Sequence, residues 1–127
     1  MKNPSGVVLD AGVFIALERR NRTIVALTQL LADTCTPLVT SAGVVAQIWR
    51  GGGRRQVAVA FLLRRASVVA LDYSIARTLG RMLGESGTTD PVDAHVVFLA
   101  RERQWPVLTS DPNDLLAIDP TLTIEKI

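Results

Sequence analysis

Cysteine, histidine and lysine are scarce in this sequence, and it has no long apolar run. Cys35 is the single cysteine among 127 residues, so an internal disulfide is excluded and a reducing cytoplasm is expected. We expect Cys35 to be a small buried hydrophobic residue. No segment reaches the roughly 18 apolar residues of a membrane span. Asp10 interrupts the first apolar stretch, unlike the apolar core of a signal peptide. The sequence therefore predicts a cytoplasmic protein with no membrane segment.

Short aliphatic runs alternate with longer helical patterns along the chain. This alternation predicts an α/β fold in which helices cover both faces of a parallel sheet, and the length suits one domain, residues 1–127. In such sheets, ligands bind at the carboxyl ends of the strands. Residues 84–89 are predicted to form a loop. The predicted strands are 7–10, 37–40, 67–71, 106–108 and 122–125, and the predicted helices are 12–19, 22–34, 42–50, 54–65, 74–83, 91–103 and a short one after Asp111.

Charge is unevenly distributed, although the whole chain carries only +2. Residues 50–81 contain seven arginines and one acid, a net charge of +6, whereas residues 82–127 contain eight acids and three basic residues, a net charge of −5. A basic middle and an acidic end suit a protein that contacts phosphates with one region and binds cations with the other. We hypothesise that the arginines of 50–65 follow an RNA backbone. The alternative is a set of solvated helix faces that pair with one another.

Five aspartates stand where predicted strands end or helices begin: Asp10, Asp90, Asp93, Asp111 and Asp114. Each has a structural alternative, because aspartate also caps helices and closes turns. Asp90 fits the cap of the helix 91–103, and Asp114 fits an early helix position favoured by the helix dipole. Asp10 and Asp111 follow two of the predicted strands, so both are expected at one edge of the sheet.

Asp93 is the hardest of the five to explain as a structural residue. Its helical neighbours Val96, Val97 and Ala100 form a stripe that is expected to face the core. The helix dipole favours a carboxylate there by about 0.3–1 kcal/mol, whereas burial of an unpaired carboxylate costs several kcal/mol. The dipole is too weak, so a partner is needed. A divalent cation shared by Asp10, Asp93 and Asp111 explains all three, although an arginine partner stays open.

Carboxylates without a histidine or cysteine set favour a hard ion, Mg²⁺ or Mn²⁺, over Zn²⁺. A water bound to such an ion can attack a phosphodiester while the ion stabilises the leaving oxygen. His95, the only histidine, is predicted to point away from the Asp93 stripe, at the surface or behind the site. Trp49 and Trp105 are expected to anchor the core or an interface.

Three segments together resemble the PIN-domain ribonucleases, and specifically the VapC-type toxins of bacterial toxin–antitoxin pairs. They are Val-Leu-Asp-Ala-Gly at 8–12, Asp-Pro-Val-Asp-Ala-His at 90–95 and Leu-Thr-Ser-Asp at 108–111. The resemblance covers nearly the whole chain in order and spacing. The family's acidic quartet falls on Asp10, Gln47, Asp93 and Asp111. Gln47 departs from the glutamate usual in the family, and it is expected to be buried beside the site, where its neutral oxygen weakens cation binding.

The resemblance implies a three-layer α/β/α fold and Mg²⁺-dependent endoribonuclease activity, with Asp10, Asp93, Asp111 and Gln47 as catalytic residues. It also implies a homodimer, an RNA substrate, and inhibition by a small antitoxin encoded alongside. Free of that antitoxin, such a toxin inhibits translation and growth. The alternative is a PIN-like module with weakened chemistry that only binds RNA or a partner, and Gln47 is the residue that supports it.

Overall fold

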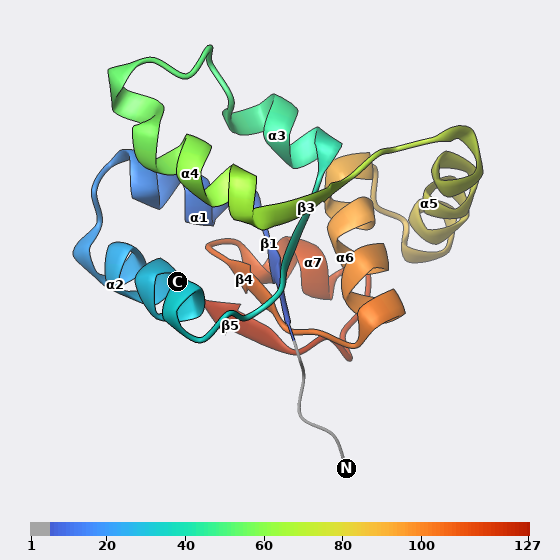
Figure 1. The fold of residues 1–127 in the computed structure, drawn as a ribbon. Coiled ribbons are helices and arrows are strands. Elements are labelled where there is room, and N and C mark those ends of the chain that lie inside the picture. Colours follow the sequence, from blue (N-terminus) through green and yellow to red (C-terminus); the bar gives the residue numbers. More distant parts are fainter. Residues whose placement is uncertain (1–5) are drawn as a thin grey trace.

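Five short parallel strands form the centre of the protein. The computed structural model describes residues 6–127. The strands hydrogen-bond in the order β3-β2-β1-β4-β5, and every pairing is parallel (Figure 1). Their bounds are β1 Val7–Leu9, β2 Leu38–Ser41, β3 Ala66–Val69, β4 Val107–Thr109 and β5 Ile124–Lys126. The predicted parallel sheet of five strands is confirmed.

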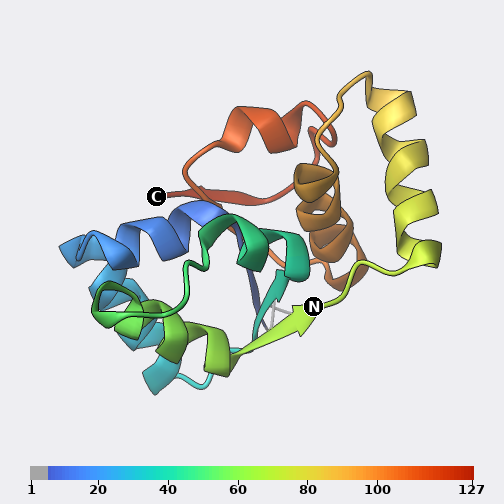
Figure 2. The ribbon, with the colours of Figure 1, turned by 90° about the horizontal axis from the view of Figure 1, so that it is seen from above.

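Helices cover both faces of this sheet. On one face α1 (Ala11–Glu18) packs against β4 and is joined by α2 (Arg22–Asp33), α3 (Ala42–Ile48) and α4 (Val57–Arg65). On the other face α6 (Pro91–Arg103) packs against β1 and β2, with α5 (Tyr73–Ser86) and α7 (Pro112–Leu116) beside it. Figure 2 shows α5 on the outer side of α6, away from the sheet. Within residues 6–127, no helix is long and apolar enough to cross a membrane, since the longest has 14 residues.

The apolar pattern of the sequence explains why β1 occupies the middle of the sheet. Val8 and Leu9 are fully buried, because α1 covers one face of the central strands and α6 the other. The stripe of α6 predicted to face the core is buried as expected, at Val96, Val97 and Ala100. Asp93 begins this stripe, so the fold brings a carboxylate to the rim of the core.

Several predicted boundaries are wrong for identifiable reasons. Helix α5 continues past the predicted end at residue 83, through Gly84 to Ser86, and it ends at Gly87, whose φ of 73° closes the helix in the left-handed conformation. The predicted helix 54–65 begins as a single 3₁₀ turn, η1 (Arg54–Gln56), and becomes α-helical from Val57. Strand β3 begins one residue earlier and ends two residues earlier than predicted, and β5 is displaced toward the C-terminus.

Two burial predictions are also wrong. Cys35 is exposed, because it lies in the turn after α2 with a φ of 53° and not in the core. Of the two positions predicted for His95, the one at the surface is wrong, because the residue is only 1% exposed. Trp49 remains partly exposed, whereas Trp105 packs against the core and against Gly6.

Gly12 holds α1 close to the segment that follows β4. A Cβ built on Gly12 would stand 2.4 Å from Ser110 Oγ and 2.9 Å from Ser110 Cβ. We predict that Gly12→Ala lowers the free energy of unfolding by about 1–3 kcal/mol, since the added methyl group is overpacked. Urea unfolding followed by circular dichroism measures this change.

Gly80→Ala is the matched control. Gly80 lies inside α5, and a Cβ there meets nothing within 4 Å. This variant should be as stable as the parent or gain up to about 1 kcal/mol from helix propensity. Equal stability of the two variants would show that the Gly12 contact has no energetic weight.

Candidate active site

Asp10 and Asp111 leave the sheet at the same edge because β1 and β4 pair in parallel. The register places Leu9 opposite Leu108, and the Asp10 N–H donates to the Leu108 carbonyl at 3.1 Å. Asp10 follows β1 directly, and Asp111 follows β4 after one residue. The carboxyl edge of the two central strands therefore carries two aspartates.

A buried threonine fixes the Asp10 carboxylate. The Thr109 hydroxyl donates to Asp10 Oδ2 at 2.7 Å, and the Asp111 N–H donates to Thr109 Oγ1 at 2.9 Å. Thr109 is fully buried and Asp10 is 8% exposed. Burial raises the pKa of Asp10, against the opposing effect of the hydrogen bond from Thr109, and the negative charges of Asp111 and Asp90 raise it further. The Asp10 side chain makes no capping hydrogen bond to α1, and a hydrogen bond with the Ala11 backbone also opposes the rise in its pKa.

Asp93 is supplied by the first turn of α6, which begins beside these strand ends. The Asp90 carboxylate accepts hydrogen bonds from the N–H groups of Val92 at 2.8 Å and Asp93 at 3.3 Å, so its predicted capping role is present. Burial raises the pKa of Asp93 to about 7, and the charges of Asp90, Asp10, Asp114 and Asp111 contribute in the same direction. The four other aspartates thus all lie within electrostatic range of Asp93.

No cation balances this group among the described residues. The ion pairs found in residues 6–127 join Arg55 to Glu18 and Arg101 to Asp119, and neither includes any of the five aspartates. The arginine partner left open for Asp93 is therefore not seen in this part of the chain. The result is a locally repulsive carboxylate cluster with a half-buried member.

Asp114 is closer to this cluster than its place in the sequence indicated. A hollow of about 310 Å³ between the start of α6 and α7 is lined by Asp90, Asp93 and Asp114 together with the 87–89 loop. Asp111 and Asp114 are both exposed, so their carboxylates are accessible from solvent. Sequence reasoning set Asp114 aside as an early-helix acid, and it missed Thr109 because a threonine at the end of a strand is common.

The donor chemistry of this group fits Mg²⁺ or Mn²⁺, since every candidate ligand is an oxygen. In the described range, no three acidic, histidine or cysteine side chains converge into a ligand shell as they stand. Mg²⁺ usually retains several waters and needs only one or two protein carboxylates directly, so a loose acidic cluster is compatible with it. The residues that would hold such an ion are Asp10, Asp93 and Asp111.

Gln47 is exposed, so the expectation of a buried glutamine beside the site is wrong. Gly43, one turn earlier on α3, faces the start of α6, because a Cβ there would stand 3.1 Å from Val92 Cγ2. Gln47 shares that side of the helix by its i+4 spacing. It therefore lies on the side of α3 that faces α6 and contributes no charge.

His95 lies on the far side of α6 from Asp93. Both ring nitrogens are buried without a hydrogen-bond partner among the described residues, and the ring centroid is 6.2 Å from that of Phe98. Burial lowers the pKa of His95, against a smaller opposing effect from Asp72 at the start of α5. A neutral imidazole between α5 and α6 takes no part in the carboxylate cluster.

The chain is an α/β protein with an acidic cluster at the carboxyl edge of a five-stranded parallel sheet. Comparison with known protein families identifies its family. The family model described as "PIN domain" matches residues 7–119. The chain therefore belongs to the PIN domain family, as its sequence predicted. Among curated proteins, no significant match is found.

Three solved structures share the fold of this chain. The structure of VapBC2 from Rickettsia felis bound to a DNA fragment from their promoter has a TM-score of 0.68 at 15% identity, and the match covers 95% of this chain and 98% of that chain. FitAB bound to the IR36 DNA fragment has a TM-score of 0.62 at 18% identity, covering 94% of each chain. FitAcB from Neisseria gonorrhoeae has a TM-score of 0.59 at 18% identity, covering 93% of this chain and 95% of that chain.

The repulsion around Asp93 leads to a stability prediction. Asp93→Asn should raise the melting temperature in EDTA, because it removes a half-buried carboxylate that four other aspartates repel. It should also reduce the rise in melting temperature that millimolar Mg²⁺ causes in the parent, since a ligand that binds the folded state stabilises it. Differential scanning fluorimetry with and without Mg²⁺ measures both effects.

Glu102→Gln is the control, because it removes an exposed acid from the same helix about 13 Å farther along.

The raised pKa of Asp93 also predicts how the stability of the folded chain changes with pH. The folded pKa of Asp93, about 7, exceeds the ordinary value of 3.8, so the folded chain binds more protons between those values and gains stability as pH falls. In EDTA, the advantage of Asp93→Asn over the parent should therefore shrink from pH 8 to pH 5. An advantage independent of pH would contradict the assignment.

Proposed function

We propose that this chain, as one PIN-like domain over residues 1–127, is an endoribonuclease that depends on Mg²⁺ or Mn²⁺. We further propose that it acts as the toxin of a type II toxin–antitoxin pair and inhibits translation and growth when free of its antitoxin. The observation that carries the proposal is the uncompensated carboxylate cluster around Asp93. Such a cluster disfavours the folded chain unless a cation is bound, so a catalytic use is the simplest reason for it.

Each residue of the candidate site has a separate role in the proposed reaction. Asp10, Asp93 and Asp111 hold the ion, and Thr109 fixes the Asp10 carboxylate through its 2.7 Å hydrogen bond. Gln47 offers a neutral oxygen from the neighbouring helix. When bound, the metal supplies positive charge at the phosphate and lowers the pKa of a water nucleophile. Because Asp10 is buried and held by Thr109, its position changes little when substrate arrives.

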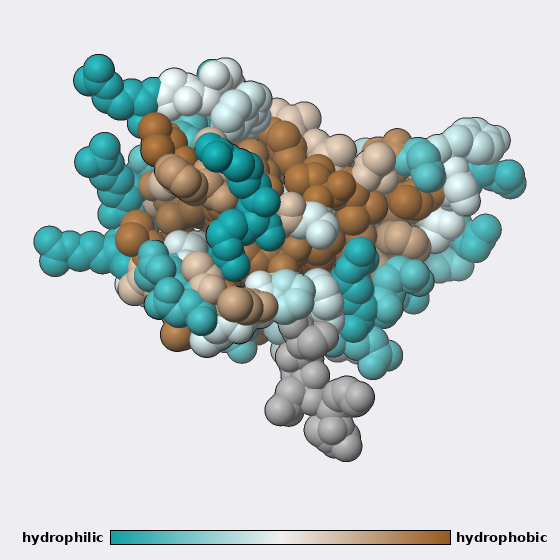
Figure 3. Space-filling model, viewed as in Figure 1, coloured by the Kyte–Doolittle hydropathy of each residue, from teal (hydrophilic) through white to brown (hydrophobic). Residues whose placement is uncertain are grey.

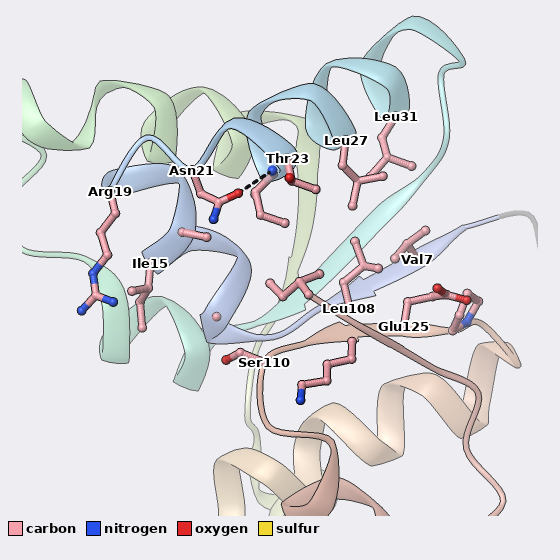
Figure 4. Close-up of a pocket in the computed structure, with 16 residues that line it drawn as sticks. Val7, Ile15, Arg19, Asn21, Thr23, Leu27, Leu31, Leu108, Ser110 and Glu125 are labelled. Carbon is pink, nitrogen blue, oxygen red and sulfur yellow. Dashed lines mark hydrogen bonds between the residues drawn. The ribbon is translucent and has the colours of Figure 1, made fainter.

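A largely apolar hollow lined by residues of α1, α2 and the strands β1, β4 and β5 suits an antitoxin segment. Figure 4 shows Leu27 and Leu31 of α2 facing Val7 and Leu108 of the sheet across this hollow, which has a volume of about 860 Å³. The VapBC2 and FitAB neighbours are toxin–antitoxin complexes, which supports an antitoxin partner here. We propose that an apolar segment of the protein encoded alongside occupies the hollow.

The antitoxin proposal predicts that one substitution can weaken partner binding without affecting RNA cleavage. Leu27→Asp should weaken binding of that partner at least tenfold, because a carboxylate would be desolvated in the apolar contact. It should leave RNA cleavage unchanged, since Leu27 belongs to α2 and none of the five aspartates lines the hollow. Isothermal titration calorimetry with the protein encoded alongside measures the affinity. Equal affinity of Leu27→Asp and the exposed control Gln29→Asp would place the partner elsewhere.

The two edges of the sheet differ in a way that favours a homodimer. Strand β5 presents the charged residues Glu125 and Lys126, which discourage edge pairing, whereas residues 66–71 around β3 carry no charge. Val68 and Leu71 are 47% and 43% exposed there, and Figure 3 shows hydrophobic residues beside this strand. We propose that a second copy covers the β3 edge. The molar mass from light scattering tests this, and Val68→Lys should shift it toward the monomer.

The competing function is a PIN-like module that binds RNA or a partner without cutting it. The deciding experiment incubates purified chain with a mixed RNA substrate and either Mg²⁺, Mn²⁺ or EDTA. We expect cleavage only with metal, and a loss of about 10²-fold or more in Asp10→Ala, as for removal of a charged catalytic group. Metal-dependent RNA binding without any cleavage would favour the binding module.

The Gln47→Glu variant tests whether the glutamine weakens RNA cleavage or abolishes it. The substitution restores a fourth negative charge on the side of α3 that faces α6, so cleavage should reach half its maximum at a lower Mg²⁺ concentration. Gln29→Glu on α2 is the matched control. If the parent is inactive and Gln47→Glu is active, the glutamine alone accounts for the lost activity.

A further inference from the structure

Gln56 is a buried polar residue outside the carboxylate cluster, and both polar atoms of its side chain make hydrogen bonds. It is 4% exposed. Its Oε1 accepts the N–H groups of Arg50 at 2.9 Å and Gly52 at 3.1 Å. Its Nε2 donates to the Ile48 carbonyl at 2.7 Å and to Glu18 Oε1 at 3.2 Å. One amide therefore folds the loop between α3 and η1 and attaches it to the end of α1.

This attachment brings two arginine-bearing segments together. Glu18 is followed by Arg19 and Arg20 in the turn that leads to α2, and Arg55 Nη2 approaches Glu18 Oε2 at 3.8 Å. We use the name arginine cluster for the five exposed residues Arg19, Arg20, Arg22, Arg54 and Arg55.

Within the described chain, Glu18 is the acid paired with this cluster. The Arg55–Glu18 pair is long, and the Arg55 side chain is 83% exposed, so it neutralises little of the positive charge. Arg64 and Arg65 are not members, because they lie at the far end of α4 and Arg64 stacks over the Phe61 ring at 5.0 Å. The structure thus divides the arginines of 50–65 and adds three from another segment.

Arg20 gives an independent indication that the positive charge is used. Its φ of 59° is left-handed, a conformation in which glycine is far more stable than arginine. The Arg20 N–H donates to Leu17 O at 3.0 Å and the Asn21 N–H donates to Ala16 O at 2.9 Å, as in a helix end closed by a left-handed residue. An arginine here strains the backbone, so its side chain needs another reason to be present.

Helix α1 relates the arginine cluster to the candidate active site. It begins directly after Asp10 and ends at Glu18, a length of about 12 Å. In Figure 1 the far end of α1 and the loop between α3 and α4 lie together at the upper left, on the opposite side of the molecule from α5. A strand whose cleaved phosphate lies at Asp10 would need to run only a few nucleotides to reach the arginines.

We propose that the arginine cluster binds backbone phosphates of single-stranded RNA beside the cleaved bond, and that Gln56 is the positioning residue that assembles it. This inference rests on the proposed function, because it takes RNA as the ligand. An acidic protein segment would also be attracted by arginines. RNA is favoured because the cluster is one helix length from the carboxylates proposed to cleave a phosphodiester, and because its members come from two separate segments, 19–22 and 54–55, which suits an extended strand.

The test measures binding of a fluorescein-labelled 12-nucleotide RNA to the full chain by anisotropy, in EDTA and over a series of salt concentrations. The variants are Arg20→Gly with Arg54→Ala, and the control is Arg77→Ala with Arg81→Ala on α5. Loss of two phosphate contacts should reduce the slope of log Kd against log salt by about 1.4 and weaken binding several-fold at low salt. Arg20→Gly should keep or raise the melting temperature, so lost binding would not reflect unfolding.

Gln56 is tested in the same assay. Gln56→Met keeps the size of the side chain and removes all four hydrogen bonds, so it should reduce the salt slope although no charge is lost. A change in melting temperature with an unchanged slope would make Gln56 purely structural and overturn its positioning role.

Three outcomes separate this inference from the proposed function. Cleavage by the parent with equal slopes for the arginine and control variants would overturn the inference and keep the nuclease. RNA binding that loses slope in the arginine variants, in a chain that never cleaves, would keep the inference and overturn the nuclease. A polyglutamate peptide that binds more tightly than the RNA, with the same variant effects, would replace RNA by an acidic protein partner.

Discussion

The hydrogen bond from Thr109 to Asp10 is the contact on which the site depends. It joins the last residue of β4 to the first residue after β1, and the same hydroxyl accepts the N–H of Asp111. Because β1 and β4 are adjacent and parallel, two segments about 100 residues apart in the chain end at the same point. The neighbouring residues tolerate little change in this arrangement, since Gly12 and Ser110 are already in close contact.

The carboxylate cluster at this edge of the sheet destabilises the folded state in which it forms. Parallel strands concentrate their terminal acids at one edge, and the first turn of α6 adds Asp93 from the rim of the core. Burial and the four neighbouring aspartates raise the pKa of Asp93 to about 7, so at neutral pH the folded chain bears a cost that the unfolded chain does not. Function of this kind is normally retained against stability, and a bound cation removes the conflict.

The sequence predicted the sheet and the candidate ligands because both depend on local patterns. The apolar runs around Val8 and Leu108 determine buried strands, and an acid after a buried strand is visible in the chain itself. The sequence did not reveal what depends on distant packing. Nothing local indicates that Thr109 turns its hydroxyl toward Asp10, that the single histidine is enclosed between α5 and α6, or that Cys35 occupies a left-handed turn. The burial of Gln47 was mispredicted because Val44 and Ile48 beside it on α3 are buried, whereas Gln47 itself is exposed although it lies on the side of α3 that faces α6.

Gln56 is another residue whose contacts the sequence does not reveal. In the sequence it is a neutral residue beside two arginines, yet its four hydrogen bonds reach three segments that no periodicity connects. Helix α1 thereby has different chemistry at its two ends, with a buried acid before its first residue and exposed guanidinium groups after its last. The net charge of only +2 therefore conceals two oppositely charged regions, one at each end of α1. Under the proposed function, a polyanion bound to the arginines would be repelled by the aspartates until a cation is present, so metal would be needed for contact at the aspartates and for chemistry, but not for contact at the arginines.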